Sequence, residues 1–195
     1  MTAQRGEILI FEGKKYTMAC EPFSQYLQKT KIELSLQATD TSLWRGYLGE
    51  WEIKENKLYL IKISGIGQIR NLERFRFEKL KLRIKLKKGI ITPQENGIRI
   101  KQLKRDCMED IELSLNSLFK SEEKVFANWY DGIIVCPYGR MINYIHLGYE
   151  STFEHELYIE VVNGEIQKYG TRSNKSKLNL FQRIINFFNF NQEVY

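Results

Sequence analysis

The sequence predicts an α+β fold made mostly of antiparallel β-sheet built from hairpins, with one central helix and an amphipathic C-terminal helix. Alternating apolar and polar residues dominate two portions of the chain, residues 1–103 and 125–169, and a helical pattern lies between them. The 11 Tyr and 11 Phe favour strands, in which aromatic residues pack well. A chain of 195 residues suits a single α+β domain, residues 1–195.

Turn residues and a proline define the first elements. The segment GEILIFEGKKYTM predicts two strands joined by a turn at Glu12–Gly13. Pro22 suits the first position of a short helical segment, because proline lacks the N–H that would be unpaired there. The segment IELSLQ, residues 32–37, then predicts a short strand.

The segment WRGYLGEWEIKENKLYLIKI, residues 44–63, predicts a hairpin with its turn at Glu55–Asn56. This register places Trp51 opposite Leu60 and Ile53 opposite Leu58 on one face. The alternation and the turn asparagine agree with each other, so the register is well specified.

A strand over residues 79–88 is predicted to carry a basic patch. The segment FRFEKLKLRIKLKKG alternates but changes phase at Glu78–Lys79, as a β-bulge would allow. In the second half of the segment every other residue is Lys or Arg, so one strand face is cationic throughout. The four residues of this patch are Lys81, Arg83, Lys85 and Lys87. The chain then continues through a predicted turn near Asn96–Gly97.

The central helix is predicted over DCMEDIELSLNSLFKSEE, residues 106–123, where apolar residues recur at helical spacing. Residues 129–169 return to strands, with a strong hairpin signal at Asn163–Gly164. The polar segment 170–177 resembles a linker, and residues 178–190 have one apolar face and predict a C-terminal helix.

Charge is distributed unevenly along the chain, whose net charge is +6. Residues 68–88 carry nine Lys and Arg against two Glu, whereas residues 129–166 carry six acids against one Arg. The N-terminus has no basic-then-apolar leader, and no stretch is apolar enough to span a membrane. The three cysteines form no C-x-x-C pair, and together these features predict a cytoplasmic protein.

The two histidines invite a test for a metal site. If strands 141–147 and 154–162 pair so that His146 faces His155, both imidazoles share one face. Zinc usually takes three or four protein ligands, and Glu150 is the one additional candidate nearby. The sequence therefore favours a structural role for the histidines in shaping the loop, with metal binding and acid–base chemistry as the alternatives. No metal site is assigned.

Other motifs for catalysis or cofactor binding are weak or missing. Cys136 lies in an apolar run within an acidic region, which favours an inert thiol over a nucleophile. The segment SGIGQIR lacks the third glycine of a dinucleotide loop, and the chain has neither a G-x-S-x-G nor an H-E-x-x-H motif. We assign no catalytic residues and no cofactor, and the sequence favours a binding protein over an enzyme.

Two blocks of sequence resemble a family of small, largely uncharacterised bacterial proteins. WRGYLGEWEIKENKLYL (44–60) matches a pattern W-R-G-Y, W-E-I and L-Y-L. WYDGIIVCPYGRMINYIHLGYESTFE (129–154) matches W-x-x-G, P-x-G, Y-x-H-x-G-Y-x-S and an aromatic–Glu pair, and His155 falls outside this pattern. The resemblance implies family membership and no particular activity. Polar matched residues at strand ends and in loops are the candidate binding residues: Arg45, Tyr47, His146, Tyr149, Ser151 and Glu154.

The sequence thus predicts an accessory protein that binds a macromolecule, for example a toxin-neutralising immunity protein of a conflict system. Its small size and split charge, which would orient a partner, favour another protein as that partner. A nucleic acid bound by the basic strand 79–88 is the second hypothesis, and a small-ligand or metal-dependent enzyme centred on His146 is the third. The C-terminal helix is a candidate contact for a second copy of the chain.

Overall fold

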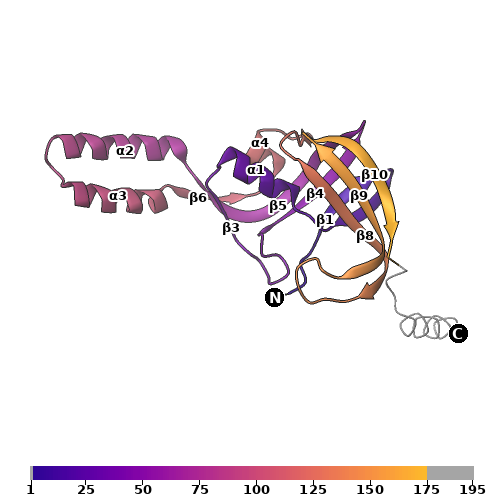
Figure 1. Ribbon diagram of the computed structural model, residues 1–195. Coiled ribbons are helices and arrows are strands. Elements are labelled where there is room, and N and C mark those ends of the chain that lie inside the picture. The colour runs from indigo at the N-terminus through magenta and orange to yellow at the C-terminus, as the bar shows by residue number, and fades with distance from the viewer. Residues whose placement is uncertain (1, 175–195) are drawn as a thin grey trace.

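In the computed structural model, which describes residues 2–174, a strongly curved sheet forms a nearly closed barrel and two helices project from one side of it (Figure 1). Backbone pairing gives the strand order β2-β1-β4-β5-β10-β9-β8. The neighbours are antiparallel except β1 and β4, which are parallel. Just beyond β2, the N–H of Ala19 donates to the carbonyl of Val135 in β8 at 2.7 Å, which brings the two ends of the sheet together.

The strands that form the barrel come from both ends of the chain. Their bounds are Glu7–Phe11 for β1, Lys14–Met18 for β2, Tyr47–Lys54 for β4, Lys57–Arg70 for β5, Gly132–Asn143 for β8, Thr152–Val162 for β9 and Glu165–Ser173 for β10. The sheet is therefore mostly antiparallel and built from hairpins, as the sequence predicts.

Three predicted hairpins are confirmed. In β4 and β5, Trp51 pairs with Leu60 and Ile53 with Leu58, in the register read from the sequence. The turn at Glu12–Gly13 joins β1 to β2, and the turn at Asn163–Gly164 joins β9 to β10. All four turn residues have positive φ, which explains why local sequence was sufficient to locate these turns.

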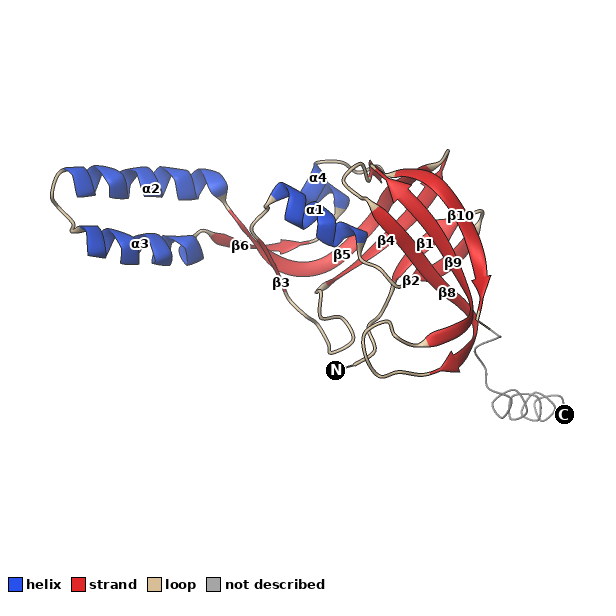
Figure 2. Ribbon diagram, viewed as in Figure 1, coloured by secondary structure: helices blue, strands red, loops and turns tan. Residues whose placement is uncertain are grey.

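The core lies inside the barrel and under two short helices, α1 (Pro22–Thr30) and α4 (Leu115–Phe119) (Figure 2). Leu9, Trp51 and Ile159 are fully buried there. Phe23 of α1 is also fully buried and packs edge-on against Tyr47, with ring centroids 5.1 Å apart. The prediction that a helix begins at Pro22 is confirmed.

The long strand β5 leaves the barrel and becomes part of a smaller sheet. Its second half pairs with β3 (Leu34–Leu36) on one side and with β6 (Met108–Glu112) on the other. We call this three-stranded unit the stalk, because the projecting helices begin and end on it (Figure 2). A further short strand, β7 (Val125–Phe126), pairs with the first half of β5.

The projecting helices are α2 (Leu72–Lys87) and α3 (Pro93–Asp106), and they lie side by side. This corrects the sequence prediction, which placed strands over 79–88 and a turn at Asn96–Gly97. The side chain of Asn71 accepts a hydrogen bond from the N–H of Arg74 and caps α2. Thr92 and Glu95 form a capping box at the start of α3, where Pro93 is the first helical residue.

The central and C-terminal regions also differ from the predictions. The continuous helix expected over 106–123 is not confirmed: residues 108–112 form β6, and a single short helix, α4, follows. The acids Glu109, Asp110 and Glu112, near the start of the expected helix, instead lie on a strand paired with β5. The first part of the predicted linker, through Ser173, belongs to β10, and the predicted C-terminal helix 178–190 lies outside the described residues. Within the described part of the chain, no helix is long and apolar enough to cross a membrane.

Candidate functional site

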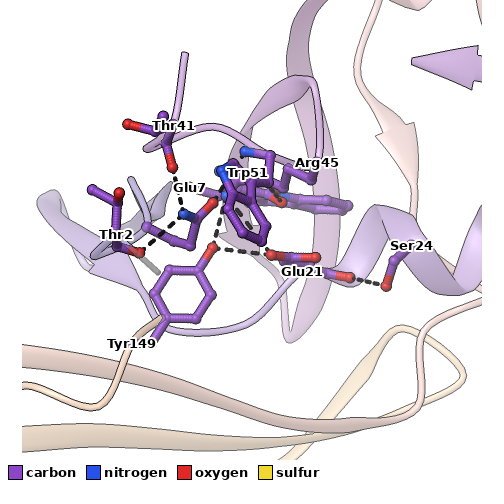
Figure 3. Close-up of polar contacts among 10 residues, drawn as sticks. Thr2, Glu7, Glu21, Ser24, Thr41, Arg45, Trp51 and Tyr149 are labelled. Carbon is purple, nitrogen blue, oxygen red and sulfur yellow. Dashed lines mark hydrogen bonds and ion pairs between the residues drawn. The ribbon is translucent and has the colours of Figure 1, made fainter. Parts of the chain in front are cut away.

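A buried polar cluster lies where four segments of the chain meet at one end of the barrel (Figure 3). It joins the start of β1, the loop after β2, the beginning of β4 with the loop before it, and the loop between β8 and β9. We call it the Arg45 cluster. Its members are Glu7, Glu21, Arg45, Tyr47, Trp51 and Tyr149.

Arg45 is the centre of this cluster, and its side chain is only 6% exposed. Its Nη1 donates to the hydroxyl of Tyr149 at 2.7 Å, and that hydroxyl donates to Oε1 of Glu21 at 3.1 Å. The Nε of Arg45 lies 3.6 Å from Oε1 of Glu7. The guanidinium carbon also lies 5.4 Å from the centroid of the Tyr47 ring, within the range of a cation–π contact. One cation thus links two carboxyl groups and two aromatic rings.

Glu7 is a fully buried carboxyl group. Burial raises the pKa of Glu7 to about 7, although the hydrogen bond from Trp51 and the charge of Arg45 oppose that rise. The indole Nε1 of Trp51 donates to Oε2 of Glu7 at 2.5 Å. The carboxyl group therefore titrates near neutral pH inside the protein.

Gly49 allows Glu7 and Trp51 to meet. A Cβ atom at this position would lie 2.3 Å from Oε2 of Glu7 and 2.7 Å from Nε1 of Trp51. Both distances are shorter than real Cβ contacts, so a side chain here would push the pair apart. The glycine in the middle of β4 is explained by this close approach.

The Arg45 cluster is built to hold segments together more than to perform chemistry. Hydrogen bonds and ion pairs join its side chains to one another, whereas Oε1 of Glu7, Nε and Nη2 of Arg45 and the hydroxyl of Tyr47 are buried without a hydrogen-bond partner in the described structure. Burial raises the pKa of Tyr149, which disfavours proton release at neutral pH. A cavity of about 220 Å³ lies beside Tyr149 and is lined mainly by apolar side chains, including Met18, Met141 and Phe153. That volume is below the roughly 300–1,000 Å³ of typical small-molecule sites. A second hollow, of about 570 Å³, falls within that range and is lined in part by Glu21, Trp44 and Arg45. The hydrogen bonds that Tyr149 makes with Arg45 and Glu21 fasten the loop 144–151 to the barrel.

The structure brings together three of the six candidate binding residues, namely Arg45, Tyr47 and Tyr149. Ser151 belongs to the same loop as Tyr149, but it bonds to the backbone of Ile145, accepting from its N–H at 3.1 Å. Glu154 lies in β9 and accepts from the N–H of Arg140 at 3.3 Å, away from the cluster.

The histidines are not paired with each other. The observed register of β8 and β9 sets His155 opposite Tyr138, and their rings stack with centroids 5.2 Å apart. His146 lies in an exposed part of the loop, where its Nδ1 is 2.7 Å from the hydroxyl of Tyr144. The register considered for a metal site does not form, because the connection is longer than a tight hairpin: β8 ends at Asn143 and β9 begins at Thr152.

Cys20 and Cys136 lie in buried surroundings that disfavour a thiolate. Cys136 is fully buried, and burial raises its pKa; burial also raises the pKa of Cys20 to about 12. Both therefore carry thiols and not thiolates at neutral pH. Among residues 2–174, no group of three or more His, Cys, Asp or Glu is arranged to hold a metal ion.

The second candidate site is the basic hairpin, which we define as residues 72–106. It contains 12 Lys and Arg but four Asp and Glu, so its net charge exceeds that of the whole chain. No residue within α2 or α3 is buried. The helices meet on half-buried faces that include Phe75 and Leu82 of α2 and Ile100 and Leu103 of α3.

The basic patch belongs to this hairpin, but its geometry differs from the prediction. In a helix, residues two apart point in nearly opposite directions. Lys81 and Lys85 therefore lie on one side of α2, and Arg83 and Lys87 lie on the other. Among the α2 cations in the described structure, Lys81 alone has an acid within 4 Å, Glu78 at 2.7 Å.

Sequence reasoning missed two acids of the Arg45 cluster, Glu7 and Glu21. Glu7 gave a usable signal, because it shares a strand face with Leu9 and Phe11, both buried. A carboxyl group on the apolar face of a strand requires a buried partner. Glu21 gave none, since it is a loop residue whose neighbours come from distant segments.

Comparison of this chain with protein-family models, with curated proteins and with solved structures found no match. Function is therefore inferred from the geometry and charge of the two sites.

Proposed function

We propose that this protein is a binding protein in which the barrel acts as a scaffold and presents the basic hairpin to an anionic macromolecule. The observation that carries the proposal is the hairpin itself, with 12 cations, four acids and no buried residue in either helix. Such a segment adds little to the core, so stability alone gives no reason for its length or charge. Clustered Lys and Arg on a projecting element speed and strengthen association with polyanions.

Binding remains the central function, but the contact surface is the pair of helices α2 and α3 instead of the strand predicted from the sequence. An acidic protein, such as a toxin neutralised by this chain, would meet the charge requirement. A nucleic acid would meet it as well. Charge alone does not distinguish these two partners. For either one, it predicts that the affinity falls steeply as the salt concentration rises.

Retention on immobilised heparin, a generic polyanion, tests the proposal. We expect the full chain to be retained at low salt, and replacement of the four basic-patch residues by Glu to abolish retention. The matched control reverses the same number of exposed cations on other parts of the molecule, at Lys14, Lys15, Lys31 and Lys54. Equal retention of both variants, or no retention of the wild type, would contradict the proposal.

A further inference from the structure

Helix α2 has a second apolar stripe, on the side that faces away from α3. Successive helical residues are 100° apart, so Phe77, Leu80 and Ile84 share the side opposite Phe75 and Leu82. We call the first three the outer stripe. Their side chains are 59%, 55% and 45% exposed. A helix of a two-helix unit needs one apolar stripe, and an exposed second stripe marks a contact surface.

Cations line both edges of the outer stripe. Arg76, Arg83 and Lys87 follow one edge, and Arg74, Lys81 and Lys85 follow the other. The Nζ of Lys81 lies 4.3 Å from the centroid of the Phe77 ring, so the lysine side chain runs along the apolar surface. Glu73 lies in line with the stripe, one turn before Phe77, at the end of α2 that joins the stalk. The face thus combines a narrow apolar centre with cationic margins along its length.

From this arrangement we infer that the outer stripe docks on a lipid bilayer containing anionic headgroups. The inference rests on the proposed presentation of the basic hairpin to an anionic partner, and it replaces the macromolecule with an anionic membrane surface. The apolar side chains would enter the boundary between headgroups and acyl chains, as in helices that lie in the plane of a membrane. The long Lys and Arg side chains on both edges can bury their aliphatic stems and extend their charges to the lipid phosphates.

Other occupants fit the surface less well. A nucleic acid would set phosphates against Leu80 and Ile84, and Phe77 is the one aromatic ring of the stripe on which a base could stack. A second copy of the chain would bring together two faces with cationic margins. Because three Arg and three Lys line the margins of each stripe, the two copies would set like charges against each other. An anionic bilayer offers negative charge on both sides of any inserted helix.

Sedimentation of the full chain with vesicles tests the inference. Vesicles of phosphatidylcholine alone are compared with vesicles that also contain phosphatidylglycerol. The stripe variant Phe77→Gln, Leu80→Gln, Ile84→Gln keeps good helix formers and all the charges. The control variant Ile8→Thr, Ile133→Thr, Val162→Thr removes three exposed apolar residues from strands of the barrel.

We expect the wild type and the control variant to bind the vesicles that contain phosphatidylglycerol, and neither to bind pure phosphatidylcholine. The stripe variant should bind the anionic vesicles at least tenfold more weakly, while its elution from heparin stays unchanged. Insertion into the bilayer is measured separately. The tryptophan introduced by Leu80→Trp should add fluorescence, and vesicles with brominated acyl chains should quench that fluorescence.

Two results would overturn the inference while leaving the proposed function intact. One is heparin retention without vesicle binding, which would point to a nucleic acid or an acidic protein. The other is vesicle binding that is equally strong in the stripe variant and the wild type, which would show adsorption by charge alone. Failure of the wild type to be retained on heparin would instead remove the proposed function itself.

Discussion

The barrel and the basic hairpin use charged residues in opposite ways. In the Arg45 cluster, a buried cation is held by two carboxyl groups and a tyrosine hydroxyl, drawn from four segments of the chain. In α2, the cations remain exposed, and Lys81 is the one with an acid within 4 Å in the described structure. Buried charges need partners because desolvation is costly, whereas exposed charges are free to meet an external partner. The first arrangement favours stability and the second favours binding.

The largest effect on stability should come from Arg45→Met. Removing the cation leaves Glu7 and Glu21 close together without compensation, which should lower the free energy of unfolding by about 3–5 kcal/mol. Urea denaturation measures this change. Lys81→Met removes a cation from the basic hairpin and is the control, with an unchanged urea midpoint. If both variants unfold at the same urea concentration, the contrast between the two regions is wrong.

The next largest effect should appear in the pH dependence of stability. Because the pKa of Glu7 rises from 4.5 to about 7 in the folded protein, the folded state binds the proton more tightly than the unfolded state. This stabilising contribution is present below about pH 4.5 and is lost as the pH rises through 7, a change of about 3 kcal/mol.

Glu7→Gln should remove this contribution to the pH dependence, since the amide does not titrate. Urea midpoints measured between pH 4.5 and 8 should therefore vary less with pH in this variant than in the wild type. Glu73→Gln on the basic hairpin is the control and should keep the wild-type profile. Parallel profiles for Glu7→Gln and the wild type would show that the carboxyl group is not coupled to folding.

A smaller effect should follow from Tyr149→Phe. The lost hydroxyl accepts from Arg45 and donates to Glu21, so its removal should cost about 1–3 kcal/mol of unfolding free energy. Tyr144→Phe makes the same chemical change in the same loop, but its hydroxyl contacts the exposed His146. Thermal denaturation should place the Tyr149 variant clearly below the Tyr144 variant, and the reverse order would argue against the Arg45 cluster as the fastener of this loop.

The smallest effect on stability should come from removing the basic hairpin. The N–H of Asn71 donates to the carbonyl of Cys107 at 2.9 Å, so an Asn-Gly turn can replace residues 72–106 between β5 and β6. We expect the shortened chain to change its unfolding free energy by less than about 1 kcal/mol and to lose heparin retention. A shortened chain that fails to fold, as judged by circular dichroism and urea denaturation, would show that the hairpin supports the barrel.

Local sequence was sufficient for the hairpins of the barrel but misleading for the basic hairpin. Leu80, Leu82, Ile84 and Leu86 alternate with cations, which is the usual signature of a strand with one apolar face. The same spacing in a helix produces two opposite apolar stripes, one against α3 and one exposed. Thr92 followed by Glu95 was a local capping signal that, with Pro93, favoured the helix.

The candidate site likewise contains residues that the sequence identified and residues that it did not. Arg45, Tyr47 and Tyr149 were picked out by their polar character and their place in the two blocks that resemble a family of bacterial proteins, and they do meet. Glu21 was missed because its contact with Tyr149, 128 residues away in sequence, leaves no trace in local spacing. Glu7 was marked only by its place on an apolar strand face, which did not reveal its partners.

By itself, the sequence determined the turns at Glu12–Gly13, Glu55–Asn56 and Asn163–Gly164. It also determined the register of the hairpin 44–63, the start of α1 and the excess of cations in residues 72–106. Each of these depends on neighbouring residues, through backbone conformation, alternation or simple composition. Only the tertiary structure decided that the cationic segment is helical, that it projects from the barrel, and that Arg45 is buried between two carboxyl groups. Those outcomes depend on which apolar faces find a partner elsewhere in the chain, and a local pattern with two valid foldings does not contain that information.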